Sequence, residues 1–217
     1  MRMRKKKNQD TRCAACAPVL LSEPQAHKGR WQELTGGRPL HLEIGCGKGK
    51  FITETAVQNP DIYYVAVERV EGALLMAMEK AMRLELGNLR FISMDAAALA
   101  EVFAAGEAER IYLNFSDPWP PKKQWKRRLT HRNMLAVYER FLTPGGEIHM
   151  KTDNRGLFEF SLCELSQCGY VLYDVTFNLH SLDIPNITTE YEEQFAARGM
   201  PIYRCVARRE MRGRLSE

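Results

Sequence analysis

Four carboxylic acids recur along the first half of the chain at intervals of 25, 27 and 22 residues, each close to the length of one strand plus one helix. Each acid stands at or just after the end of a short apolar run. They are Glu43, Glu68, Asp95 and Asp117. Ligands of open α/β sheets bind outside the carboxyl ends of the parallel strands. The four acids are therefore predicted to line one crevice and to bind a ligand with several hydrogen-bond donors or a positive charge.

The segment after the first apolar run is rich in glycine, with Gly45, Gly47 and Gly49 alternating with other residues. Glycine permits positive φ and a close approach of a ligand to the backbone. Lys50 stands where a dinucleotide fingerprint has its third glycine, and no Ser or Thr follows it as a P-loop requires. This loop with an acid two residues ahead suits S-adenosylmethionine, whose cationic methionine end lies over the glycines. Glu68 is then placed to bind both ribose hydroxyls. For the glycines alone, a tight strand-to-helix turn is the alternative.

The fourth acid begins a second segment whose residues could bind a substrate, because Trp119 and three prolines follow Asp117 directly. Prolines hold a loop in an extended form, and a carboxylate beside an indole presents a planar base by hydrogen bonding and stacking. A rigid surface loop with Trp119 packed on the core is the alternative. A run of basic residues starts at Lys122, so an acceptor pocket and a phosphate-binding surface are neighbours. This adjacency favours an enzyme that modifies nucleic acid.

The elements that position these residues alternate between short apolar runs and amphipathic segments. Strands are expected at residues 40–44, 62–67, 89–94, 110–115, 147–151, 171–177 and 202–207. Helices are expected at residues 50–59 and 70–86, then from a Thr130 cap through 142, and from an Asp153 cap to Gly169. This alternation predicts an α/β fold with a parallel sheet covered on both faces and an antiparallel last strand.

The net charge of +4 on 217 residues, 45% of them hydrophobic, is that of an ordinary globular chain and excludes a disordered one. One core serves up to roughly 250 residues, so a single domain is expected. The charge is segregated, because residues 1–7 hold five basic groups and residues 122–132 hold six, with no acid in either stretch. The rest of the chain has 20 basic and 27 acidic residues, a net charge of −7. Two cationic segments on an acidic body suggest contact with an anionic polymer; a solvated tail and loop are the alternative.

No apolar run reaches the roughly 18 residues of a membrane span, and Asp10, Arg12 and Pro18 interrupt any resemblance to a signal peptide. A cytoplasmic protein with reduced thiols is expected. Cys13 and Cys16 form half of a zinc-site pattern that no second pair completes, so no metal is expected.

Five segments resemble the bacterial tRNA (guanine-N7)-methyltransferase family, TrmB, across about residues 38–206: "HLEIGCGKG", "YLNFSDPWP", "KRRLT", "KTDNRGLFE" and "TEYEEQF". The resemblance implies a Rossmann-like class I methyltransferase fold with a mostly parallel seven-stranded sheet, over residues 38–217. A basic, partly flexible extension over residues 1–37 precedes it. The implied reaction moves a methyl group from S-adenosylmethionine to N7 of a guanosine in the variable loop of tRNA, position 46, and leaves S-adenosylhomocysteine. A monomer or homodimer is expected.

The family pattern also assigns residues. It implies that all four acids contact the cofactor and that Asp117 is also catalytic. Substrate-binding positions are Lys122, Asp153, Thr189, Glu190, Tyr191 and Glu192, and RNA contacts are Lys123, Lys126, Arg127 and Arg128. Members commonly have a lysine directly after the second proline, where this chain has Pro121, and Lys122 is expected to take its place.

Two of these assignments have structural alternatives. Residues 189–192 also read as a capping box, and Asp153 as a helix cap. Two rival classes also remain open. A methyltransferase acting on a small molecule or a protein leaves the cationic loop unexplained, and a non-catalytic RNA-binding module leaves the four acids unexplained.

Overall fold

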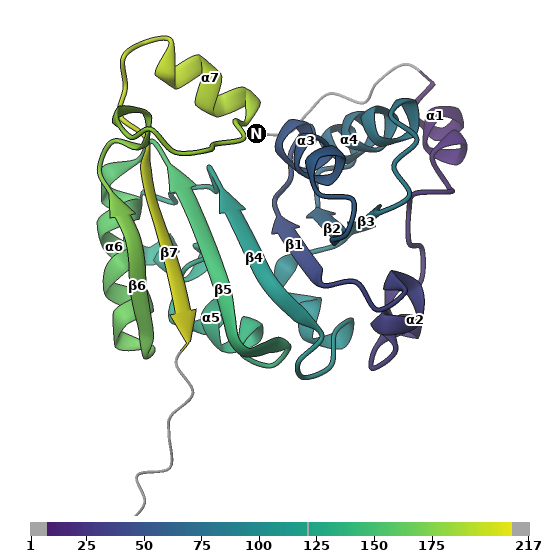
Figure 1. Cartoon of the computed structure of the whole chain (residues 1–217), viewed down its shortest axis with the longest axis horizontal. Coiled ribbons are helices and arrows are strands. Elements are labelled where there is room, and N and C mark those ends of the chain that lie inside the picture. The colour runs from purple at the N-terminus through teal and green to yellow at the C-terminus, as the bar shows by residue number, and fades with distance from the viewer. Residues whose placement is uncertain (1–7, 121, 210–217) are drawn as a thin grey trace, which may run out of the picture.

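The computed structural model describes residues 8–120 and 122–209, and a single sheet runs through this part of the chain (Figure 1). Its strand order is β3-β2-β1-β4-β5-β7-β6. Neighbours from β3 to β5 pair in parallel, and β7 pairs antiparallel with both β5 and β6. The predicted mostly parallel seven-stranded sheet with an antiparallel last strand is confirmed. The strands are β1 (Leu40–Ile44), β2 (Tyr63–Glu68), β3 (Leu89–Ser93), β4 (Ala108–Asn114), β5 (Leu142–Thr152), β6 (Tyr170–Thr176) and β7 (Tyr203–Arg209).

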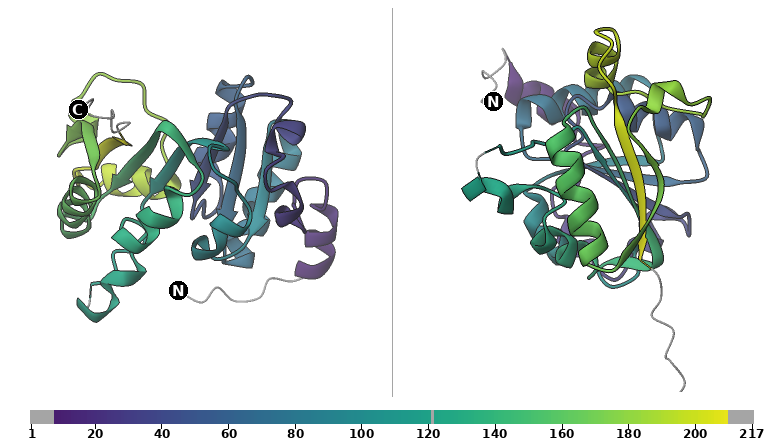
Figure 2. Two further views of the ribbon diagram at one scale, coloured as in Figure 1. Left: turned by 90° about the horizontal axis from the view of Figure 1, so that it is seen from below. Right: turned by 90° about the vertical axis from the view of Figure 1, so that its left-hand side faces the viewer.

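Helices cover both faces of the sheet, as Figure 2 shows from two sides. The α-helices are α1 (Gln9–Ala15), α2 (Trp31–Thr35), α3 (Lys50–Gln58), α4 (Glu71–Arg83), α5 (Arg132–Tyr138), α6 (Arg155–Gln167) and α7 (Glu190–Ala196). Short 3₁₀ turns are η1 (Pro24–His27), η2 (Ala96–Glu101), η3 (Lys122–Arg127) and η4 (Leu179–Ser181). In the described part of the chain no helix is long and apolar enough to span a membrane.

Strand β2 shows how one apolar run serves two cores. Val65 and Val67 pack in the cluster that contains residues of α5 and α6, whereas Tyr64 and Ala66 pack in the cluster that contains residues of α3 and α4. Successive side chains of a strand point to opposite faces. A strand covered on both faces therefore reads as continuously hydrophobic.

Residues 8–37 pack onto the sheet and helices as part of the same body. The Arg12 guanidinium makes two hydrogen bonds of 2.7 Å to the Glu79 carboxylate of α4. Trp31 is fully buried, and its indole Nε1 donates to the Val102 carbonyl at 3.0 Å. The expected extension is therefore continuous with the domain from residue 8 onward. The basic residues 2 and 4–7 lie outside the described residues.

Helix α5 begins later than the sequence predicted and has a different cap. The expected cap, Thr130, is fully buried with its hydroxyl 2.6 Å from that of Ser161. His131 is the N-cap instead, and its Nδ1 accepts from the Asn133 amide at 3.1 Å. The prediction for Thr130 is wrong because a residue of α6 takes its hydroxyl.

The boundaries around β5 also differ from the prediction. Strand β5 begins at Leu142 rather than at residue 147, since Leu142 pairs with Ala108 and the pairing shifts register beyond it. At its other end Asn154, not Asp153, caps α6, and its Oδ1 accepts from the Leu157 amide at 2.8 Å. Asp and Asn are both good helix caps. Which of two adjacent ones caps the helix depends on the backbone angles, and the residue types alone do not predict these.

Candidate active site

The parallel order of β1 to β4 brings the four predicted acids to one edge of the sheet. Glu43 is opposite Ala66 of β2, two residues before Glu68. Asp95 and Asp117 follow the ends of β3 and β4. The connection of each strand to the next through a helix therefore places acids that are far apart in the sequence along one edge. The expectation that all four line one crevice is not met, because Glu43 alone of the four lines the pocket at this edge.

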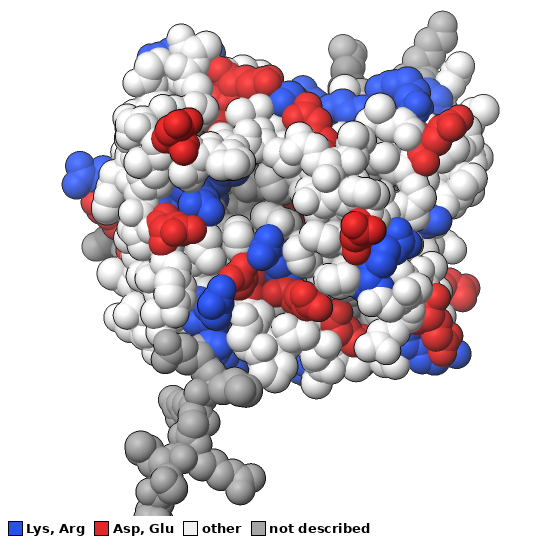
Figure 3. All heavy atoms as spheres, in the orientation of Figure 1, with Lys and Arg blue, Asp and Glu red and all other residues white. Residues whose placement is uncertain are grey.

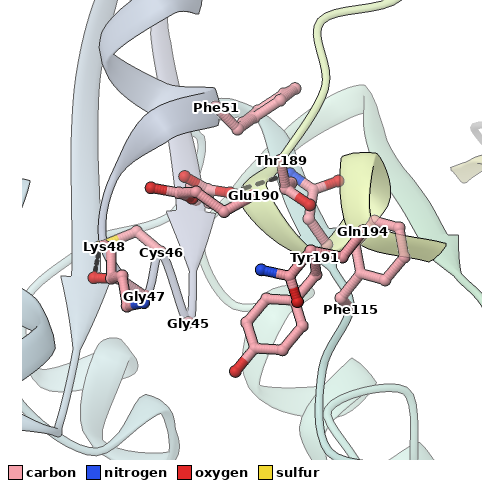
Figure 4. Close-up of a pocket in the computed structure, with 12 residues that line it drawn as sticks. Gly45, Cys46, Gly47, Lys48, Phe51, Phe115, Thr189, Glu190, Tyr191 and Gln194 are labelled. Atoms are coloured by element: carbon pink, nitrogen blue, oxygen red, sulfur yellow. Dashed lines mark hydrogen bonds between the residues drawn. The ribbon is translucent and has the colours of Figure 1, made fainter. Parts of the chain in front are cut away.

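A pocket of about 190 Å³ opens at this edge between the glycine loop and helix α7. Figure 4 shows the two walls facing each other, with Phe115 beside them. The lining residues are Glu43, Gly45, Cys46, Gly47, Lys48, Phe51, Asn114, Phe115, Thr189, Glu190, Tyr191 and Gln194. The structure thus brings three predicted cofactor residues and three predicted substrate residues into one cavity. Phe51, Asn114, Phe115 and Gln194 also line it, although the sequence pattern alone does not single them out.

Glu43 forms the polar floor of the pocket and has only one of its oxygens satisfied. The Asn114 amide donates to Oε1 at 2.9 Å, whereas the buried Oε2 has no hydrogen-bond partner. Burial raises the pKa of Glu43 to about 8, because desolvation disfavours the ionised form. An unpaired carboxylate oxygen in a buried site is costly, and a cationic group in the pocket would satisfy it.

The three glycines of the loop have two different jobs. All have positive φ, between +56° and +80°. A Cβ at Gly45 or Gly47 would meet no atom within 4 Å, so these two leave open space at the pocket. A Cβ at Gly49 would lie 2.5 Å from the Cβ of Ala77 on α4. Gly49 therefore permits α3 to pack on α4. It was expected at the cofactor, but it is not among the residues that line the pocket.

Glu68 and Asp95 are engaged in local backbone hydrogen bonds. Glu68 accepts from the amide of Gly47 at 3.0 Å and from that of Val70 at 2.8 Å. The exposed Asp95 caps η2 by accepting from the Ala97 amide at 3.0 Å. Glu68 thereby fixes the glycine loop directly, while Asp95 lies at the neighbouring strand end and outside the pocket.

The loop after β4 combines backbone strain with an accessible acid. Phe115 and Trp119 have φ values of +51° and +41°, a conformation that costs non-glycine residues on the order of 1–3 kcal/mol. The Asp117 side chain is 69% exposed and lies 3.9 Å from the Arg69 guanidinium, beyond the end of β2. Asp117 is therefore free to meet an incoming molecule at the edge of the sheet.

Turn η3 carries the predicted RNA-contacting cations, and the structure divides them. Lys123, Lys126 and Arg127 are exposed, and the Arg127 guanidinium lies 3.8 Å from the centre of the Trp119 ring. Arg128 is buried, and its Nε donates to the Pro118 carbonyl at 2.8 Å. The expectation that Arg128 contacts RNA is corrected, because its guanidinium braces the β4 loop from inside. Pro121 and the side chain of Lys122 lie outside the described part of the structure, so the proposed replacement of the lysine stays a prediction.

Helix α7 forms the second wall of the pocket. Thr189 is its N-cap, and its hydroxyl accepts from the Glu192 amide at 2.9 Å. Glu190 and Tyr191 face the pocket, with Tyr191 59% exposed. The cap and the pocket positions predicted for this segment occur together.

Glu192 lies behind this wall and not in the pocket. It is fully buried, and its Oε2 accepts from the Lys151 ammonium of β5 at 2.7 Å. Its Oε1 meets the Asn186 amide and the His180 ring. The assignment of Glu192 to direct substrate contact is corrected, because three side chains enclose its carboxylate. Lys151 was not selected from the sequence, although a lysine at the end of an apolar strand was a usable signal.

Two cations outside the core tie α7 to the glycine-loop side. The ammonium of Lys50 lies 2.9 Å from the Glu193 carboxylate and donates to the Thr188 hydroxyl at 2.8 Å. Lys80 of α4 pairs with Glu190. Lys50 was read from the sequence only as a departure from a dinucleotide fingerprint, and its partner lies 143 residues away.

The surface in Figure 3 shows acidic and basic side chains interspersed, with no extended patch of one sign on that face. Among the described residues no cluster of three or more His, Cys, Asp or Glu is arranged to hold a metal ion. Cys13 and Cys16 are free thiols, and burial raises the pKa of both.

Comparison with known proteins gives related sequences and related folds. A family model described as "Putative methyltransferase" matches residues 37–205. The chain is 50% identical over 211 residues to the tRNA (guanine-N(7)-)-methyltransferase of Geobacillus thermodenitrificans, covering 96% of this chain and 98% of that protein. It is 48% identical over 210 residues to the protein of that name from Listeria innocua, with 96% and 98% covered.

Two solved structures are similar in fold. The 16S rRNA methyltransferase KamB has a TM-score of 0.65 at 14% identity and covers 84% of this chain and 94% of its own. A 16S rRNA (adenine(1408)-N(1))-methyltransferase from Catenulisporales acidiphilia, solved with its cosubstrate SAM, has a TM-score of 0.58 at 13% identity and covers 97% and 95%. At such low identity these likenesses support the fold alone.

Proposed function

The chain belongs to the tRNA (guanine-N7)-methyltransferase family, and we propose that it methylates N7 of the guanosine at position 46 in the variable loop of tRNA. When bound, S-adenosylmethionine supplies a methyl group on a positively charged sulfur, and S-adenosylhomocysteine is the product. Because its proposed substrate is tRNA, the protein is proposed to act in the cytoplasm.

The unpaired Oε2 of Glu43 is the observation that carries this proposal furthest. A buried carboxylate oxygen without a partner fits the ammonium group of the cofactor's methionine end. Gly45 and Gly47 leave room for that end above the backbone. Glu68 is the residue for the ribose hydroxyls, with Asp95 at the next strand end toward the base.

Asp117 is proposed to hold the acceptor guanine. N7 of guanine has an exposed lone pair and no proton, so no general base has to act before methyl transfer. The protein must mainly orient N7, and orientation of this kind supplies up to roughly 7–11 kcal/mol. The accessible Asp117 carboxylate can accept from the N1 and N2 donors of guanine and offset the positive charge that methylation places on the ring.

The remaining predicted residues surround this acceptor. We assign Thr189, Glu190 and Tyr191 to the substrate side of the pocket, together with Asp153 beyond β5 and Lys122 on η3. We assign the contacts with the tRNA phosphates to Lys123, Lys126 and Arg127. Such contacts are electrostatic, so they weaken as the salt concentration rises.

The proposal is tested by incubating the protein with methyl-labelled S-adenosylmethionine and an unmodified tRNA transcript, then mapping the methylated base. Label on N7 of guanosine 46 is expected, and none on a transcript with adenosine at that position. Label on another base would overturn the assignment, and absence of label from every RNA would overturn RNA methylation itself.

Replacing Asp117 with Asn tests its assigned role. We expect kcat to fall by several orders of magnitude while the cofactor Kd, measured by calorimetry, changes little. Asp61→Asn, at an exposed loop before β2, is the matched control and should behave as wild type. Equal losses in kcat and cofactor affinity would mean that Asp117 serves cofactor binding instead.

A further inference from the structure

A second hollow, of about 530 Å³, lies between the β4 loop, η3 and the first turns of α6. Its walls include Pro118, Pro120, Trp125, Arg128, Phe160 and Cys163. Figure 2 shows η3 standing out from the sheet on the side of α6. Its lining residues are all different from those of the cofactor pocket, although both adjoin the β4 loop. It is within the range of roughly 300–1,000 Å³ typical of small-ligand sites.

The walls of this groove are flat and mostly apolar. The rings of Trp125 and Phe160 lie 5.8 Å apart at an angle of 57°. The Arg128 guanidinium packs on both rings, 5.0 Å from the centre of the Trp125 ring and 4.4 Å from that of the Phe160 ring. Trp125 remains 36% exposed, and Cys163 is exposed. The groove therefore presents aromatic surface that Arg128 holds in position.

The turn that supplies Trp125 to the groove is cationic. Lys123, Lys126 and Arg127 are exposed on η3, which contains no acid. Glu159 lines the groove, but its carboxylate is paired with Arg155 at 2.7 Å. An apolar, aromatic groove beside a cationic turn is complementary to a nucleotide, whose base is flat and whose phosphate is anionic.

We propose that this groove binds an unpaired nucleobase of the tRNA, a neighbour of the methylated guanosine, against Trp125 and Phe160 with its phosphates on the η3 cations. The inference rests on the proposed function. The target guanosine itself belongs at Asp117 and the cofactor pocket, from which this groove is separate in every lining residue. Holding a neighbouring base apart from the RNA stack sets the register that brings the target to Asp117.

Kinetics of tRNA methylation test the stacking surface. Trp125→Ala should lower kcat/KM by about 10- to 100-fold, the loss expected for one base–aromatic stack, chiefly through KM. Trp125→Phe should restore most of it. The Kd of S-adenosylmethionine should not change. Leu84→Ala, which removes another exposed apolar side chain at the end of α4, is the matched control. Thermal unfolding identifies any variant that has lost its fold.

Alkylation of Cys163 by N-ethylmaleimide tests occupancy without a variant. Saturating tRNA should slow alkylation of the Cys163 peptide about tenfold or more, whereas polyphosphate, which has charge but no bases, should not. Equal protection by both polyanions, or no protection by tRNA, would overturn the proposal.

The two proposals can fail separately. If the wild-type protein methylates guanine N7 while Trp125→Ala matches Leu84→Ala in kcat/KM, the groove proposal is overturned and the proposed function stands. If the wild-type protein methylates no RNA, the proposed function is overturned, and protection of Cys163 by tRNA still decides whether the groove binds RNA.

Discussion

The two walls of the proposed cofactor pocket are built by different means. The glycine-loop wall is made by nearby backbone, since Gly45, Gly47 and Glu68 close it through positive φ and one amide hydrogen bond. The α7 wall is held by charged side chains from distant elements, chiefly Lys151 with Glu192. One wall therefore depends on conformations that only glycine adopts readily, and the other on ion pairs that form only in the folded protein.

The largest effect is expected at the buried pair behind α7. Lys151→Met leaves the fully buried Glu192 carboxylate without its cation, which costs about 3–5 kcal/mol. Hydrogen exchange should show loss of protection at residues 186–196, together with a fall in kcat/KM for tRNA. In the double variant Lys151→Met/Glu192→Leu no buried charge remains, so most of the protection should return. A double variant as damaged as the single one would show that the pair does more than compensate charge.

On the opposite wall, Gly49→Ala should lower the free energy of unfolding by about 2–4 kcal/mol, from overpacking against Ala77 and a left-handed backbone. Urea unfolding measures this. Gly145→Ala, with φ of +77° and no atom near its Cβ, isolates the backbone part, about 1–2 kcal/mol.

Gly45→Ala sharpens the same contrast. It should resemble Gly145→Ala in stability and lose cofactor binding in calorimetry. If it kept full affinity for the cofactor, the open space at Gly45 would not be the binding surface.

The floor between the walls predicts a pH dependence. The pKa of Glu43 is about 8 in the free protein, and a neighbouring ammonium group lowers it by favouring the carboxylate. Binding of S-adenosylmethionine should therefore release a proton below pH 8, so affinity rises with pH between 6 and 7.5, by at most about tenfold per unit. Calorimetry in buffers of different ionisation enthalpy measures the proton. Glu43→Gln should bind weakly with no proton release; an unchanged release would assign the proton to another group.

The smallest effect is expected at the exposed ion pair between Lys80 and Glu190. Lys80 and Glu190 keep 27% and 29% of their side chains exposed, and exposed pairs contribute about 0.2–1 kcal/mol. Lys80→Ala should change the unfolding free energy by no more than this, and the difference from wild type should shrink at high salt. A loss as large as that of Lys151→Met would remove the distinction between this exposed pair and the buried pair.

Much of this site was predictable because its parts are local. The strand-helix alternation, the glycine loop and the acids at the strand ends follow from spacing within single βα units, and parallel connection places them at one edge. The helix caps were predicted wrongly where two adjacent residues compete for one role. Thr130 lost its cap position to His131 because Ser161 takes its hydroxyl, and Asp153 lost its position to Asn154.

The order of strands and helices, the gathering of acids at one edge of the sheet and the presence of a cationic segment all follow from the residue pattern alone. Which charged side chains are buried and which stay exposed depends on how the elements pack together. Arg127 and Arg128 are adjacent, yet Arg127 is exposed and Arg128 is buried against the β4 loop. Likewise Glu190 faces the pocket, whereas Glu192 is buried and paired with Lys151. The reason is physical. A charge is buried only where a partner offsets its desolvation, and those partners come from elements that meet only when the sheet is assembled.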